Sequence, residues 1–197
     1  MQQPVLNRSR SDKFSFVLDL PKALKRTVDK VLPIYSADTV QFTTFGSPVP
    51  AISVPDINLA FGGQSFHTSS NSRPAYPPLN IKFLVDNGYQ NYWILWKWLN
   101  LFNDASNSVT DINSSVVNNN KVLLSNSLSD YISTFSLFAL DEYNNKIIEF
   151  KYTNAFITGL SPIEFSFQNP DQIICNATFV FNQLQVDLLA DINVSAC

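Results

Sequence analysis

YPPLNIKFLVDNGYQNYWILWKWLNLFND, residues 76–104, is the segment that decides the fold, because it joins the clearest strand of the chain to its clearest helix. The apolar residues Ile81, Phe83 and Val85 alternate with polar ones, which is the period of a strand buried on one face. The Asp-Asn-Gly sequence that follows is typical of a tight turn. Over Tyr89–Asn103 apolar side chains recur at helical spacing. The segment therefore predicts a strand, a turn and one dominant helix.

The predicted helix is apolar on a second face as well. Trp93, Trp98 and Leu101 lie outside its main apolar stripe, and few of its residues favour water. A helix that is apolar on nearly every side is normally buried on nearly every side. Two interpretations stay open for the second face: loops of the same chain cover it, or a second subunit does.

The composition favours one domain with a large core. Of the 197 residues, 45% are hydrophobic and 15% are charged, and 16 are phenylalanine. A chain of this length can bury a substantial core. The net charge of −3 disfavours a protein that grips nucleic acid through its phosphates.

The sequence also bears on the compartment. No apolar run is long enough to cross a membrane, and the N-terminal sequence MQQPVLNRSRSDKF lacks the apolar stretch of a secretory signal. Cys175 and Cys197 are too few for a disulfide framework. We expect them to be free thiols of a protein made in a reducing cytoplasm.

Alternating apolar residues predict further elements before the central segment. These are a strand at 13–20, a short helical insert at 21–33, a strand at 38–45 and a hairpin arm at 56–68. Pro21 suits the first turn of the insert, and Pro33 closes it. Gly62 and Gly63 supply the turn of the arm. Residues 1–12 are expected to form a flexible tail.

A polar loop and a second group of strands complete the domain. Residues 104–127 are rich in Asn and Ser, which compete with regular structure through local hydrogen bonds. Strands are expected at 131–140, 146–153 and 173–188, the last with a bulge near Asn182, and the segment 155–162 contains Gly159 and precedes residues 163–167. The predicted class is mostly β: an antiparallel barrel or sandwich of seven or eight strands with one flanking helix. It forms a single domain over residues 13–188, followed by a tail at 189–197.

Residues for catalysis, or for binding a metal or cofactor, do not form any known pattern. The single histidine, His67, is expected in an exposed Ser/Thr loop, too isolated for a zinc site or a catalytic triad. Asp104 and Asp111 could suggest calcium, but the EF-hand spacing is absent. Motifs of nucleotide binding and of hydrolases are absent too. We therefore expect no enzyme activity, cofactor or metal.

Three tryptophans, Trp93, Trp96 and Trp98, allow a rival interpretation. They could form an aromatic platform that binds sugars, which would make the chain a soluble carbohydrate- or protein-binding β-sandwich. Tryptophans at helical spacing are more often core or interface residues.

The order of these elements resembles the tail tube proteins of contractile-tailed bacteriophages, the family of the T4-type tube protein. The resemblance covers residues 38–188. A proline-containing linker at Pro48–Pro55 precedes the arm, and a strand leads into the tryptophan-containing helix within Leu79–Asn103. The Gly-Leu-Ser-Pro turn at 159–162 and the final strand around 177–181 complete the pattern. The helical insert departs from the simplest family pattern.

The resemblance implies a structural virion protein. Six copies would form a ring with a continuous inner β-barrel, and stacked rings would form the tail tube through which DNA is ejected. The implied partners are further copies of the chain, the tail sheath protein, baseplate or tube-initiator proteins and the tape measure protein. DNA would pass through the lumen without specific binding, and no membrane is involved.

The implied location is the virion tail, assembled in the cytoplasm of the host bacterium. A baseplate-proximal tube-initiator ring, or the tube of a related contractile injection or secretion system, stays open as an alternative. We expect the assembly interface at the arm tip and on the outer flank of the helix. The residues are Phe61, Gly62, Gly63, Phe66, Trp93, Trp98 and Leu101.

Overall fold

The structure is a computed structural model that describes residues 9–22, 24, 25, 28, 44–101, 131–167 and 171–189. Its strands are β1 (Phe14–Leu18), β2 (Thr44–Gly46), β3 (Asp56–Phe61), β4 (Gln64–Ser69), β5 (Leu79–Leu84), β6 (Ser133–Leu140), β7 (Lys146–Leu160), β8 (Ile174–Val180) and β9 (Gln183–Leu188), and its main helix is α2 (Gln90–Asn100). The described residues therefore form nine strands, not the seven or eight predicted. One reason is that the last predicted strand, 173–188, is divided into β8 and β9.

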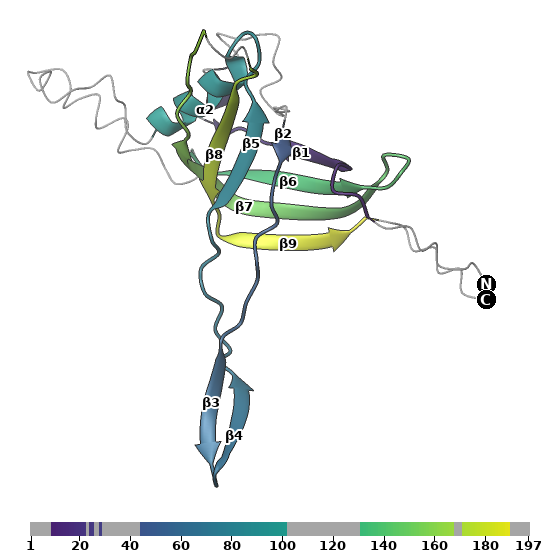
Figure 1. The fold of residues 1–197 in the computed structure, drawn as a ribbon, viewed down its shortest axis with the longest axis vertical. Helices are drawn as coiled ribbons and strands as arrows, with labels where there is room; N and C mark the ends of the chain where they lie inside the picture. The colour runs from purple at the N-terminus through teal and green to yellow at the C-terminus, as the bar shows by residue number, and fades with distance from the viewer. Residues whose placement is uncertain are drawn as a thin grey trace, which may run out of the picture.

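Strand β7 connects the two layers of the body (Figure 1). Its first half pairs with β6 on one side and β9 on the other, while its second half pairs with β8. The sheet continues from β8 through β5 to β2, and from β6 to β1, with every pair antiparallel. The strands form a nearly closed, barrel-like antiparallel sheet with α2 beside it, which confirms the predicted class.

The two layers meet where β7 bends. Asn154 lies at this bend with a φ of 53°, a left-handed conformation that Asn tolerates better than most residues. Opposite the bend, β8 ends at Val180 and β9 begins at Gln183, and the Asn182 N–H donates to the Thr153 carbonyl (3.2 Å). The bulge predicted near Asn182 is therefore a full break in the strand, at which the chain passes from one layer to the other.

The strand expected at 146–153 is longer than predicted. It continues to Leu160 as the single strand β7, because the bend at Asn154 redirects the strand without ending it. Residues 163–167 form no strand. Phe165 is 77% exposed and Phe167 is fully exposed, so the alternation there does not reflect a buried face.

An aromatic cluster fills the core between the layers and α2. Phe135 of β6 stacks on Tyr152 of β7 with ring centroids 4.6 Å apart. Phe179 of β8 contacts Phe135 at 5.5 Å and Trp98 of α2 at 5.7 Å. All four side chains are almost completely buried. The surroundings of Tyr152 are so apolar that burial raises the pKa of its hydroxyl well above the ordinary value, because the phenolate would lose its hydration.

The N-terminus of helix α2 is capped by a network of side chains and not by a Ser or Thr residue. Tyr89 precedes the helix with a φ of 54° and makes no side-chain cap. The Asp86 carboxylate instead accepts hydrogen bonds from the Gln90 N–H (2.7 Å) and the Asn91 N–H (3.4 Å). The buried Asn91 amide donates to the Leu84 carbonyl (2.8 Å). The predicted turn thus also caps the helix and fixes it to β5.

The N-terminal elements agree with the predictions as far as they are described. β1 lies within the predicted 13–20, and β2 contains the described end of the predicted 38–45. Within the predicted helix 21–33, the described residues 22, 24, 25 and 28 are helical. The Leu24 and Lys25 N–H groups both donate to the Pro21 carbonyl (3.0 and 2.9 Å), as expected for proline in the first turn.

Other predictions lie outside the described residues. They concern the tail before residue 9, the polar loop at 104–127 with Asp104 and Asp111, and the C-terminal tail beyond residue 189 with Cys197. Cys175 is described, and it is a buried free thiol as predicted. None of the helices in the described ranges has the length and apolarity to span a membrane.

Candidate assembly surface

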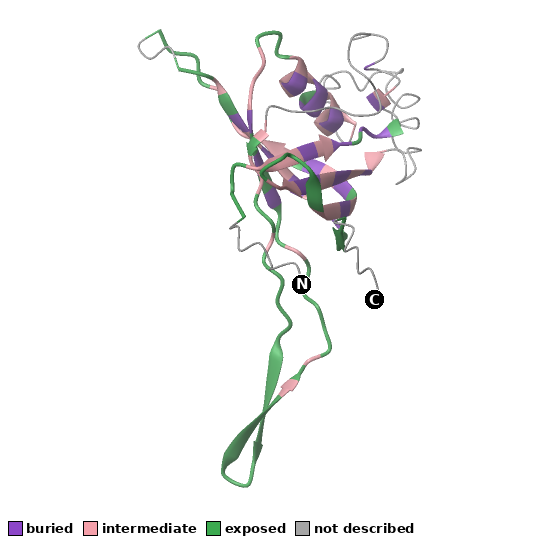
Figure 2. Ribbon diagram, turned by 90° about the vertical axis from the view of Figure 1, so that its right-hand side faces the viewer, coloured by how far each residue is buried: buried purple, intermediate pink, exposed green. Residues whose placement is uncertain are grey.

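The β3–β4 hairpin projects from the body as an arm (Figure 1), and almost all of it is exposed to solvent (Figure 2). Its strand register places Leu59 opposite Phe66 and Phe61 opposite Gln64, so these residues share one face. Ile57 lies on the same face, since side chains alternate along a strand. These four apolar residues, Ile57, Leu59, Phe61 and Phe66, are 44%, 49%, 84% and 62% exposed, respectively. We call them the apolar face of the arm.

The opposite face of the arm is polar. It contains Asp56, Asn58, Ser65 and His67. His67 is therefore part of strand β4, not of a loop as the sequence suggested, and its Nδ1 lies 2.9 Å from Asp56 Oδ2. The contact links β3 to β4 at the end of the arm that is nearer the body. Both side chains are well exposed, whereas the side chains of a catalytic or metal site are usually enclosed.

The tip of the arm is a two-residue glycine turn, as predicted. Gly62 and Gly63 have φ angles of 59° and 79°, which glycine adopts without steric cost and which match the turn that two-residue hairpins prefer. Nothing lies within 4 Å of the space a side chain would occupy at either position. The glycines are needed for the turn and not for close packing.

The remaining predicted interface residues lie on helix α2 or at its C-terminal end, and some of them are core residues while others are at the surface. Trp98 is fully buried, and its indole N–H donates to the Tyr131 carbonyl (2.9 Å). It therefore packs inside its own chain and is not available to contact a neighbouring subunit. Trp93 and Leu101 are partly buried. The arm points away from α2, so the two groups of predicted residues do not form one surface (Figure 1).

The three-tryptophan platform required by the rival interpretation is absent, because Trp98 is enclosed in the core. Trp96 is 40% exposed. The Lys97 ammonium lies 5.7 Å from the ring centroid of Trp93 and 5.1 Å from that of Trp96. At these distances the ammonium is attracted to the negatively polarised faces of both rings. It therefore occupies part of the ring surface on which a sugar would stack.

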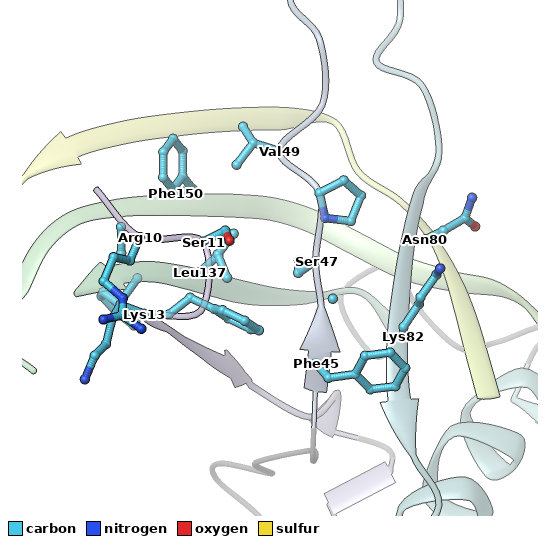
Figure 3. A pocket seen from close by; sticks show the side chains of 15 residues that line it. Arg10, Ser11, Lys13, Phe45, Ser47, Val49, Asn80, Lys82, Leu137 and Phe150 are labelled. Carbon is cyan, nitrogen blue, oxygen red and sulfur yellow. The ribbon is translucent and has the colours of Figure 1, made fainter. Parts of the chain in front are cut away.

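A groove not anticipated from the sequence opens beside the root of the arm (Figure 3). It has a volume of about 770 Å³ and runs between the chain around β2 and strands β6 and β7. Phe45 and Val49 form one wall, and Leu137 and Phe150 belong to the other. Arg10, Lys13 and Lys82 also line it. We call this feature the root groove.

An exposed edge strand is a second feature that the sequence analysis missed. β9 pairs with β7, and its other edge has no partner among the described strands. Val186 and Leu188 on β9 are 48% and 67% exposed. An open edge of this kind presents unpaired N–H and C=O groups and can add a strand from another chain.

Within the described ranges, no three His, Cys, Asp or Glu side chains come together as they would around a metal ion. The exposed features are instead apolar surfaces and a sheet edge, which are features of protein contacts. The family model of phage tail tube proteins matches residues 9–187 of this sequence. The chain belongs to the phage tail tube protein family.

Solved structures with a similar fold include components of contractile injection systems. A chain of the PVC sheath–tube complex, an extracellular contractile injection system in its extended state, has a TM-score of 0.58 at 12% identity and covers 94% of this chain and 95% of its own. The tube-terminating cap of the anti-feeding prophage scores 0.59 at 14% identity, covering 95% and 96%. The 6-fold symmetrised baseplate of that prophage scores 0.50 at 10%, covering 95% and 97%. A search of curated protein sequences found no match.

The family match gives a structural role, and the solved structures give the fold. The protein is a tail tube subunit, a structural component of a virion tail, as the order of its strands and helix suggested. The tube of a related injection or secretion system is the alternative within the same architecture.

Proposed function

We propose that this tail tube subunit forms rings of six copies that stack into a hollow tube, and that phage DNA passes through the tube into the host. The observation that supports stacking is the apolar face of the arm. A two-stranded hairpin is at best marginally stable alone in water, and this one exposes two phenylalanines on a single face. Contact with a neighbouring subunit would remove that surface from water and hold the hairpin in place.

Ring closure is supported by the open edge of β9. Each subunit in a closed ring makes the same head-to-tail contact with the next, and pairing β9 with a neighbour would extend the sheet across the boundary between subunits. Six copies agree with the symmetry named for the similar baseplate structure. The closed ring would have no open edge at β9, which removes the risk of uncontrolled aggregation.

The remaining partners follow from the place of a tube in a tail. The tube would lie inside the tail sheath protein, start from baseplate or tube-initiator proteins and enclose the tape measure protein before DNA enters. A net charge of −3 suits a passage that DNA crosses without specific binding, because like charges repel phosphates. Assembly would take place in the cytoplasm of the host bacterium, and catalysis, metal binding and a cofactor have no part in this function.

Electron microscopy and sedimentation of the purified protein test this proposal. Rings and tubes are expected for the natural chain, whereas the double variant Phe61→Asp/Phe66→Asp should stop at single rings or monomers. Tyr143→Asp is the matched control, because Tyr143 is 83% exposed on the β6–β7 turn and is not on the arm. A chain that remains a folded monomer at every concentration would refute the proposal.

The same images separate the alternative roles. A baseplate-proximal initiator should form single rings that do not elongate, whereas a main tube subunit should form long tubes. The tube of an injection or secretion system would elongate too, and a sheath gene and a tape measure gene beside a capsid gene would favour the phage tail.

A further inference from the structure

We propose that the root groove of one subunit receives the arm tip of a second copy, with Phe61 and Phe66 packing against Phe45, Val49 and Phe150. The proposal rests on the stacking proposed above and adds the surface that receives the arm. It makes ring stacking a head-to-tail contact between two places on the same chain.

The chemistry of the root groove fits this occupant. Leu137 is 5% exposed at the groove, and Phe150 packs against the main core. Phe45 and Val49 across from them are 46% and 43% exposed. An aromatic side chain placed between these walls would extend the core outward and remove apolar surface of both partners from water, at about 25 cal/mol per Å².

The charges are compatible as well. Arg10, Lys13 and Lys82 lie along the groove (Figure 3), and the Arg10 guanidinium is already paired with Asp12 at 2.7 Å. From Ile57 to Phe66 the arm has no charged residue, so nothing near its tip repels these cations. The carbonyls of the glycine turn are hydrogen-bond acceptors for which a lysine ammonium of the groove is a suitable donor.

In this extended conformation the arm is too long for its tip to dock in the groove of its own subunit. Val49 lines the groove, and Phe61 lies twelve residue steps further along the chain. At about 3.3 Å per extended residue the tip stands up to about 40 Å from Val49, and Figure 1 shows the arm pointing away from the body. A second copy displaced along the arm by that length would place its groove at the tip. Repetition of this displacement gives an open stack and not a closed dimer.

A single contact of this kind should be weak. Two phenylalanines bury on the order of 300–500 Å² together, which is far less than the 1,200–2,000 Å² of a stable interface. The contact therefore needs several arms acting at once, as two stacked rings would provide. We expect it in assembled tubes and not between dilute monomers.

Disulfide trapping between two variants, each with one accessible cysteine, tests the proposal. Phe61→Cys labelled with ¹⁵N is mixed with unlabelled Val49→Cys, both with Cys197→Ser, and is allowed to assemble under mild oxidation. Cys175 can stay because it is completely buried. Mass spectrometry should find the 61–49 disulfide between a labelled and an unlabelled chain, because docking raises the effective concentration of the two thiols.

Phe165→Cys is the control in place of Val49→Cys. Phe165 is 77% exposed and does not line the groove. The yield of the 61–49 disulfide should exceed that of the 61–165 disulfide by at least about tenfold, as expected for a docked pair of thiols. Equal yields, or a dominant 61–165 product, would overturn the assignment of the groove.

Microscopy of the same samples distinguishes the two proposals. Tubes without the 61–49 disulfide would refute the root groove as the receiving surface and leave stacking intact. A natural chain that forms no tubes would refute both, whereas failure of the Phe61→Cys chain alone is the effect expected from losing the Phe61 ring. The axial repeat of the tubes is a second measurement, since a repeat well above about 40 Å cannot be bridged by an arm of this length.

Discussion

The β3–β4 and β7–β8 hairpins have the same alternation of apolar and polar residues but opposite surroundings. Phe179 of β8 and Ile157 of β7 are at most 2% exposed, whereas Leu59 and Phe61 of β3 are 49% and 84% exposed. Alternation makes one face of a two-stranded ribbon apolar. It does not determine what covers that face.

The covering elements make the difference between the two hairpins. Strand β5 pairs beside β8, and α2 places Trp98 against Phe179 at 5.7 Å. The arm is joined to the body by the segment containing Pro48, Pro50 and Pro55, which separates it from every sheet partner except its own second strand. One hairpin is thus completed within the chain, and the other depends on another copy under our proposal.

The largest expected effect on stability comes from removing the Trp98 side chain, which packs over β8. Trp98→Ala should lower the free energy of unfolding by about 3–5 kcal/mol, because it leaves a cavity beside Phe179 and removes the hydrogen bond to the Tyr131 carbonyl. Urea unfolding of the monomer measures the change. Trp96→Ala, on the 40% exposed side of α2, should cost less than about 1 kcal/mol. Equal losses would mean that the two sides of α2 are not core and surface.

The next comparison replaces one aromatic residue of the body and one of the arm by alanine. Phe135→Ala should lower monomer stability by about 3 kcal/mol, since its ring packs on Tyr152 and Phe179. Phe61→Ala should change it by less than about 0.5 kcal/mol and should weaken assembly. Thermal unfolding and sedimentation give the two measurements. A Phe61→Ala chain as unstable as Phe135→Ala would show that the arm packs on its own body.

A smaller effect is expected where α2 joins β5. Asp86→Ala should cost about 1 kcal/mol, because the Gln90 and Asn91 N–H groups lose their acceptor. Asp86→Asn is the matched control and should recover part of the loss, since its amide oxygen can still accept one bond. Urea unfolding of both variants is the measurement, and a neutral Asp86→Ala variant would refute the capping role.

Two left-handed residues permit a finer test. Asn154→Ala and Gly62→Ala each place an alanine at a φ above 50°, which alanine tolerates less well than Asn or Gly, at a cost of about 1 kcal/mol. Global unfolding should register the first, because Asn154 bends the central strand β7. The second should leave global unfolding unchanged and speed amide hydrogen exchange in the arm alone. Slower or equal exchange in the arm of the Gly62→Ala variant would contradict the independence of the arm.

The smallest expected effect concerns the β6–β7 turn of the body. Hydrogen bonds from the Asn145 side chain, and from the Asn145 and Tyr143 N–H groups, lower the pKa of Asp141 below its ordinary value of 3.8. The turn is therefore stabilised fully above the ordinary pKa, and this contribution is lost as the pH falls through the lowered folded value. NMR titration should show the Asp141 pKa returning toward 3.8 in Asn145→Ala. An unchanged pKa in that variant would exclude the Asn145 side chain as the cause.

Local patterns predicted those elements whose burial follows from neighbours in the sequence. Residues 79–100 gave the strand and helix correctly, because a period of two and a helical period are both visible there. Gly62 and Gly63 identified the hairpin arm through turn chemistry alone. The order of the elements was sufficient to suggest the tail tube family.

Contacts between distant residues account for the errors. The strand predicted to end at 153 continues through the bend at Asn154, and the break near Asn182 divides another predicted strand, since each depends on pairing across the sheet. The root groove brings together residues as distant as Lys13 and Phe150, which no local pattern could assemble. His67 was assigned to a loop from its Ser and Thr neighbours, although the arm predicted at 56–68 already included it and its pairing with β3 places it in a strand.

The sequence by itself determined the mostly β class, the apolar helix and the presence of an arm with one apolar face, because these depend on side-chain periodicity and on glycine and proline. The tertiary structure decided which of the apolar residues are satisfied within the chain. Trp98 and Phe61 are equally apolar in the sequence, but one is enclosed by strands from the C-terminal half and the other stands alone in solvent. Burial is a property of how distant segments pack, and composition cannot specify it.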